Sequence, residues 1–100
     1  MLLDNSFFYP GNVIYNTFNI DFDRPFIEQL DELNEDLVQV EYKENYLLDI
    51  GWYPECETKG KIIVQLIHNS QWEKPVLRKE CITQELFLKN LLEITEMMKK

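Results

Sequence analysis

The chain has 100 residues, 45% of them hydrophobic, which is enough for one domain with a modest core and too apolar for a disordered segment. Its formal charge of −8 argues against a direct nucleic-acid ligand, because phosphate binding needs a basic surface, and it fits a basic partner or simple solubility. No stretch approaches the ~18 consecutive apolar residues of a membrane helix.

The first predicted element is a strand over residues 12–22, after the turn dipeptide Pro10-Gly11. The alternation places Ile14, Phe18, Ile20 and Phe22 on one side. The polar Asn16 is the one break on that side.

A helix is predicted next, from Phe26 to about Val38, because Asp23-Arg24-Pro25 supplies a typical helix start. Apolar residues at 26, 27, 30, 33 and 37 cover one face. The opposite face carries Glu28, Asp31, Glu32 and Glu35, with Asp36 at its edge. No base within this helix offsets them.

Two strands, residues 46–53 and 61–68, are predicted to form an antiparallel hairpin around the polar loop 54–60. Residues 75–81 are expected to form a short edge strand, since Pro75 cannot donate to a ladder.

Thr83 is a suitable N-cap for a final helix whose buried stripe is Phe87, Leu91, Ile94 and Met98. The order of elements predicts an α+β fold in a single domain over residues 1–100. We expect an antiparallel sheet of three to four strands with two main helices packed against it.

All of the negative excess lies between Asp21 and Asp49. This segment has ten acids against Arg24 and Lys43, a net charge of −8, and the rest of the chain is neutral. The acids are Asp21, Asp23, Glu28, Asp31, Glu32, Glu35, Asp36, Glu41, Glu44 and Asp49. A surface built only for solubility usually mixes signs, whereas a unipolar region directs a field at an opposite patch. We therefore interpret the region as a binding surface, with a solvated surface as the alternative.

Aromatic residues are the usual anchors of an interface. Trp52 shares a predicted strand face with apolar residues and is expected in the core, whereas Tyr53 and Trp72 lie near loops; Trp72 could equally fill the core under the final helix. The candidate partner-binding residues are Asp21, Asp23, Glu28, Asp31, Glu32, Glu35, Asp36, Glu41, Glu44, Tyr53 and Trp72.

No catalytic constellation is apparent, and we expect neither an enzyme nor a metal or cofactor site. His68, the single histidine, is expected to be structural or at the surface. Cys56 lies between two glutamates, which disfavour a reactive thiolate, and Cys81 is expected to be buried. The pair Asp21 and Asp23 is expected to cap the following helix rather than to hold Mg²⁺ or Ca²⁺.

The location is expected to be cytoplasmic. Residues 1–4 have no basic region of the kind that begins a secretory signal, unless a leader has already been removed from a mature chain. Two cysteines are fewer than a small secreted scaffold usually carries, so reduced thiols are expected.

One pattern spans the central third of the chain: Asp49-Ile50-Gly51-Trp52-Tyr53-Pro54-Glu55, then Gly60, the apolar run Ile62–Ile67, and Trp72-Glu73-Lys74-Pro75. It resembles small bacterial immunity proteins of polymorphic-toxin and contact-dependent growth inhibition systems. The resemblance implies an inhibitor that binds the C-terminal toxin domain of a large effector, often a nuclease with a basic surface. It assigns no role to any single residue.

The leading hypothesis is an immunity protein, a monomer in a 1:1 complex, whose Asp21–Glu44 region fills the basic active-site cleft of a toxin. No membrane and no nucleic acid would be bound directly. The alternative is an acidic regulatory adaptor or subunit with a different basic partner. A third hypothesis is a small enzyme that uses His68 and a nearby acid.

Overall fold

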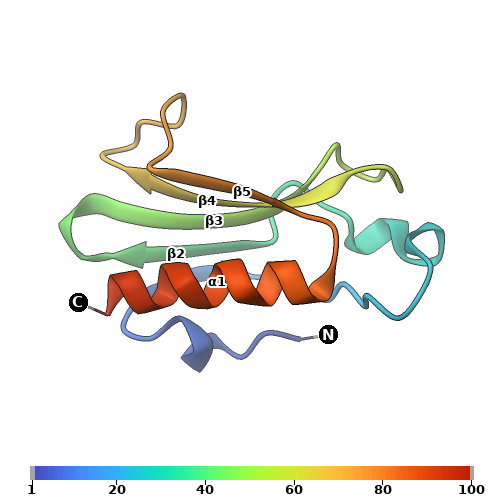
Figure 1. Cartoon of the computed structure of the whole chain (residues 1–100), viewed down its shortest axis with the longest axis horizontal. Helices are drawn as coiled ribbons and strands as arrows, with labels where there is room; N and C mark the ends of the chain where they lie inside the picture. Colours follow the sequence, from blue (N-terminus) through green and yellow to red (C-terminus); the bar gives the residue numbers. More distant parts are fainter. Residues whose placement is uncertain (1, 100) are drawn as a thin grey trace.

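The computed structural model describes residues 2–99 and shows an α+β fold with an antiparallel sheet, as predicted (Figure 1). The sheet has five strands rather than three to four, in sequence order: β1 (Asn12–Asn16), β2 (Val38–Tyr42), β3 (Tyr46–Tyr53), β4 (Lys61–His68) and β5 (Leu77–Cys81). One α-helix, α1 (Gln84–Met98), follows β5. Three 3-10 helices complete the order: η1 (Asn5–Phe8), η2 (Phe26–Glu32) and η3 (Lys43–Asn45).

The central hairpin has the bounds that the sequence predicts. β3 and β4 pair over their full length, from Tyr46 opposite His68 to Tyr53 opposite Lys61. β5 pairs only with β4 and is an edge strand, with Pro75 before its start.

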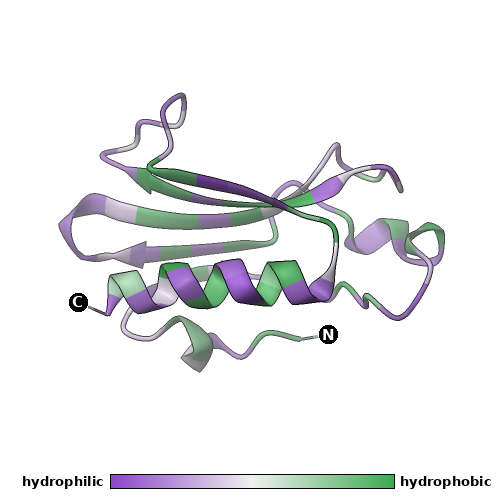
Figure 2. Ribbon diagram, viewed as in Figure 1, coloured by the Kyte–Doolittle hydropathy of each residue, from purple (hydrophilic) through white to green (hydrophobic). Residues whose placement is uncertain are grey.

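One face of the sheet packs against α1, which runs along the strands in Figure 1 with η1 beside it. Thr83 Oγ1 accepts a hydrogen bond from the Leu86 amide at 3.1 Å, which confirms the predicted N-cap. Phe87, Leu91 and Ile94 are buried as expected, and Met98 is partly buried against them. Figure 2 shows apolar and polar residues alternating along this helix.

Trp52 confirms its predicted core position, with 1% of its surface exposed. Its indole Nε1 donates to the Glu57 carbonyl oxygen at 2.7 Å, which satisfies the one polar group of the buried ring. Trp72 is not a core residue, because it lies in the β4–β5 loop with 45% of its surface exposed.

The first strand is shorter than predicted. β1 ends at Asn16, and an irregularity in its pairing with β2 falls between Val13 and Tyr15. This bulge breaks the alternation, so Ile14 is 53% exposed instead of facing the core. Phe18 is buried beyond the end of the strand, where its ring stacks on Phe87 at 5.1 Å.

The helix expected over residues 26–38 is present only in its first half. The segment forms the 3-10 helix η2, which ends at Glu32 and has non-helical dihedral angles at Gln29. The buried Gln29 amide accepts from the Asp21 backbone N–H at 2.8 Å and donates to the Asp21 carbonyl oxygen at 2.7 Å. These hydrogen bonds between the Gln29 side chain and the Asp21 backbone compete with the formation of a regular helix.

The strand β2 begins where the helix was expected to end. Val38 and Val40 are buried in the core and Gln39 and Glu41 point to the opposite face, which is the period of a strand. The preceding residues also follow β3, since the Trp52 N–H donates to the Asn34 carbonyl and the Leu37 N–H to the Ile50 carbonyl.

Candidate functional site

The candidate site is the sheet face opposite α1, here called the open face. Side chains alternate along each strand, so the neighbours of the core residues point to this face. Its members are Gln39, Glu41, Leu47, Asp49, Gly51, Tyr53, Lys61, Ile63, Gln65, Ile67, Arg78 and Glu80. Glu35, Asp36, Ile14 and Tyr15 line the hollows of the same surface.

A row of polar side chains crosses the open face from one edge strand to the other. The strand register places Tyr15 opposite Gln39, Gln39 opposite Asp49, Asp49 opposite Gln65, and Gln65 opposite Arg78. Directly opposed residues on one face have Cβ atoms about 4.5–5.5 Å apart, and Gln39 and Asp49 are joined by a side-chain hydrogen bond. Asp49 therefore sits at the centre of the sheet with an amide on either side.

Asp49 is a buried carboxylate that forms no ion pair with the residues the structure describes. Only 1% of its surface is exposed, and one of its oxygens accepts from Gln39 Nε2 at 3.1 Å. The other oxygen, Oδ2, has no hydrogen-bond partner among the described residues. Burial raises the pKa of Asp49 and repulsion from Asp36 adds to this, while the Gln39 and Gln65 amides favour the charged form.

The backbone of Glu35 reaches the open face because residue 51 has no side chain. A Cβ at Gly51 would overlap the Glu35 carbonyl oxygen and crowd the Tyr53 ring. The glycine thus lets the Glu35–Asp36 segment and Tyr53 lie close to Asp49. Burial raises the pKa of Tyr53 to about 12, and the negative charges of Asp49, Asp36 and Glu35 add to the shift.

The bases of the open face are already paired. Lys61 Nζ lies 2.8 Å from Glu80 Oε1 and Arg78 Nη1 lies 2.6 Å from Glu80 Oε2. These bonds lower the pKa of Glu80 to about 2. With Glu80, the face has five carboxylates against two bases, a net charge of −3.

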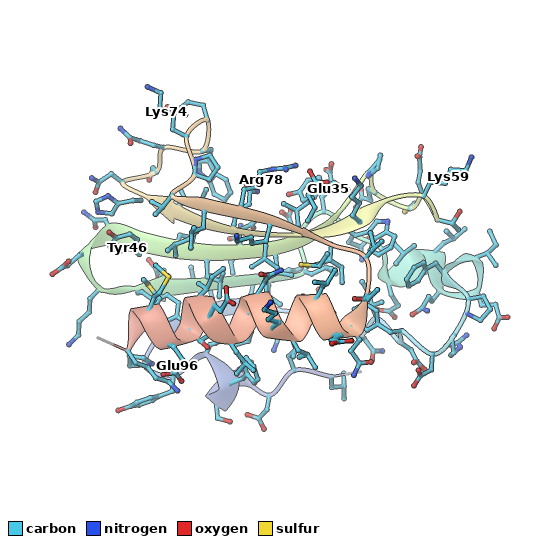
Figure 3. The ribbon with its side chains drawn as sticks, in the orientation of Figure 1. Glu35, Tyr46, Lys59, Lys74, Arg78 and Glu96 are labelled. Carbon is cyan, nitrogen blue, oxygen red and sulfur yellow. The ribbon has the colours of Figure 1, made fainter. Side chains whose placement is uncertain are left out.

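Three hollows lie on this surface. One of about 350 Å³ is lined by Glu35, Tyr53, Arg78 and their neighbours, and one of about 340 Å³ by Ile14, Tyr15, Asp36 and Gln39. The first is lined by residues of β3, β4 and β5, and the second by residues of β1 and β2. The third, of about 530 Å³, includes Glu41 in its lining. Figure 3 shows Glu35 and Arg78 on the side of β5 away from α1, with Glu96 on the helix side.

The structure brings four of the sequence-predicted residues together on the open face: Glu35, Asp36, Glu41 and Tyr53. The others lie elsewhere. Asp21, Asp23, Glu28, Asp31 and Glu32 belong to η2 and the turn before it, Glu44 to η3, and Trp72 to the β4–β5 loop.

The pair Asp21 and Asp23 does not cap η2. Asp21 Oδ1 accepts from the Asp23 N–H at 2.9 Å and closes a turn, while the N-cap position of η2 is Pro25, without a side-chain bond. Among residues 2–99, no group of three or more acids, histidines or cysteines is arranged to hold a metal ion.

His68 lies at the end of β4, where its ring stacks on Tyr46 at 4.2 Å and its Nε2 lies 3.0 Å from the Glu44 carbonyl oxygen. Cys56 is exposed and Cys81 is buried, and neither is in a disulfide. Burial raises the pKa of the Cys81 thiol. The contacts of His68 give it a structural role at the end of β4, away from Asp49.

Sequence reasoning counted Asp49 among the acids but did not single it out. A signal was present: Asp49, Gly51 and Tyr53 alternate with the core residues of β3 and therefore share its second face. The row through Gln39 could not be found, because the sequence analysis did not predict the strand β2.

No helix in the described part of the chain is long and apolar enough to cross a membrane. No protein-family model, curated protein or solved structure matches the chain.

Proposed function

We propose that this protein is an immunity protein that binds a basic toxin domain, of the nuclease kind, and covers its active site with the open face. The observation that most directly supports this proposal is the sheet face opposite α1, which no helix covers in the described part of the chain. On it lie Tyr53 and four acids: Glu35, Asp36, Glu41 and Asp49. Surfaces of one sign attract opposite patches and raise association rates, and tyrosine is a common anchor of interfaces.

The residues behind the resemblance to immunity proteins support this choice of surface. Asp49, Gly51 and Tyr53 are the alternate residues of that pattern in β3, and all three point to the open face. The acidic surface is therefore proposed to lie on the sheet, rather than on the helix face that the sequence predicted. The acids of η2 would contribute long-range attraction.

The test uses the toxin domain encoded beside this gene, with survival on co-expression and affinity of the purified proteins as readouts. Two triple variants change the charge equally: Glu35, Asp36 and Glu41 to lysine on the open face, and Glu28, Asp31 and Glu32 to lysine in η2. The open-face variant should lose protection and bind at least roughly a hundredfold more weakly, since like charges across an interface are strongly unfavourable.

The η2 variant should keep protecting and lose mainly association rate at low salt. Equal effects of the two triple variants would show that charge acts without a defined surface. If the wild-type protein neither binds the toxin domain nor protects against it, the immunity function itself is wrong.

A further inference from the structure

The polar row on the open face contains a charge that the fold leaves unpaired. Among residues 2–99, no group lies in hydrogen-bonding geometry to Asp49 Oδ2, although the nearby Gln65 amide favours the charged carboxylate. The residue is only 1% exposed, and its other oxygen accepts from Gln39. Buried carboxylates are usually paired, and the exceptions concentrate at functional sites. Asp49 Oδ2 is therefore a candidate acceptor for a group that a partner supplies.

The fold contains a suitable counter-ion in the same row but uses it elsewhere. Arg78 is separated from Asp49 only by Gln65, yet its guanidinium lies 2.6 Å from Glu80. Lys61, the other base of the face, is paired with the same glutamate. Asp49 is thus isolated from both bases that could have neutralised it.

The surroundings of Asp49 suit a planar cation. The amides of Gln39 and Gln65 flank the carboxylate, and each can turn its oxygen toward an N–H donor. The Tyr53 ring lies beside Gly51, and aromatic rings of this kind stack on guanidinium groups. Both glutamines are only half-buried, so their side chains can move aside for an entering group.

We infer that Asp49 is the receptor for an arginine side chain of the partner, which inserts between Gln39, Gln65 and Tyr53 and pairs with Oδ2. The inference rests on the proposed function for the identity of the partner, a basic toxin domain. This contact would anchor the complex at the centre of the open face, because interface hot spots usually lie near the centre of an interface.

The first test compares Asp49→Asn with Glu93→Gln in binding to the toxin domain encoded beside this gene. Both remove one negative charge, and Glu93 is exposed on α1, away from the open face. We expect Asp49→Asn to weaken binding at least roughly thirtyfold, mainly through faster dissociation, because it removes one partner of a buried ion pair. Glu93→Gln should change affinity less than about twofold.

The outcomes separate the two proposals. Absence of binding by the wild-type protein contradicts the immunity function. Wild-type binding with equal affinities for the two variants leaves that function standing and overturns the role of Asp49.

The second test needs no partner and uses methylguanidinium chloride as the probe. The midpoint of the Asp49 carboxyl titration is followed by carbon-detected NMR in methylguanidinium chloride and in sodium chloride at equal ionic strength. A lower midpoint for Asp49 in methylguanidinium, with the exposed carboxyl of Asp4 as the reference, supports the receptor. Equal midpoints for Asp49 in the two salts would overturn it.

Discussion

The carbonyl oxygen of Glu35 lies in the space that a side chain at Gly51 would occupy. This contact joins the acidic segment before β2 to the middle of β3. The Glu35–Asp36 segment follows β3 between the Trp52–Asn34 and Leu37–Ile50 bonds, and its backbone fits there because residue 51 has no side chain.

Gly51→Ala should lower the free energy of unfolding by about 2 kcal/mol or more, because the new methyl group meets backbone rather than a flexible side chain. Urea denaturation measures the change. Thr58→Ala, in the exposed β3–β4 loop, should leave stability within about 0.5 kcal/mol of the wild type. A tolerated Gly51→Ala would mean that the Glu35 segment is not held against the sheet.

Asp49→Asn should stabilise the free protein at neutral pH. Burial raises the folded-state pKa of Asp49, so the wild type gains relative stability at low pH and loses it as the pH rises through that raised pKa. The substitution removes this titration while keeping an acceptor for Gln39. The ionisable groups near Asp49 and the neighbouring Tyr53 are Glu35, Asp36 and Arg78.

Urea unfolding across a pH series checks this expectation. The variant should exceed the wild type by about 1 kcal/mol at neutral pH, the lower end of the cost of an unsatisfied buried polar group, and the gain should vanish on acidification. A variant that is less stable than the wild type at neutral pH would show that the unpaired oxygen does not destabilise the fold.

Gln29→Ala should lower the free energy of unfolding by about 2 kcal/mol, because it removes the amide that bonds both backbone groups of Asp21 and leaves them without these partners. Gln71→Ala is the matched control, since Gln71 is exposed in the β4–β5 loop. Equal denaturation midpoints for the two variants would contradict a structural role for the buried amide.

Glu80→Gln should leave stability within about 1 kcal/mol of the wild type, as expected for an exposed ion pair. It frees Lys61 and Arg78 to repel a basic partner, so association with the toxin domain should slow at low salt. Glu96→Gln frees Lys99 on the opposite side of the molecule and should leave the association rate nearly unchanged. Similar rates for both variants would argue against the open face as the binding surface.

The sequence predicted the elements whose patterns are local. β3, β4, the edge strand β5 and α1 with its Thr83 cap all have clear periodicity or a capping residue. The antiparallel α+β class followed from their order. Trp52 was placed in the core because it alternates with other apolar residues of β3.

The prediction of a regular helix over residues 26–38 failed for a physical reason. Apolar residues at 26, 27, 30, 33 and 37 fit a helical face, yet Gln29 is pulled inward by Asp21 and Val38 begins a strand. Both outcomes depend on contacts made in three dimensions, with the Asp21 turn and with β3. The open face could not be found without β2, because Gln39 and Glu41 were assigned to no element of the sheet.

The segment that carries Glu35 and Asp36 is fixed at both ends, by the bond from Trp52 N–H to Asn34 and by the bond from Leu37 N–H to Ile50. A flexible loop would lose conformational freedom when a partner ordered it, at a cost of about 1–2 kcal/mol per residue. Here that ordering is completed during folding. A partner therefore meets two preorganised carboxylates, and more of the interaction energy remains available as affinity.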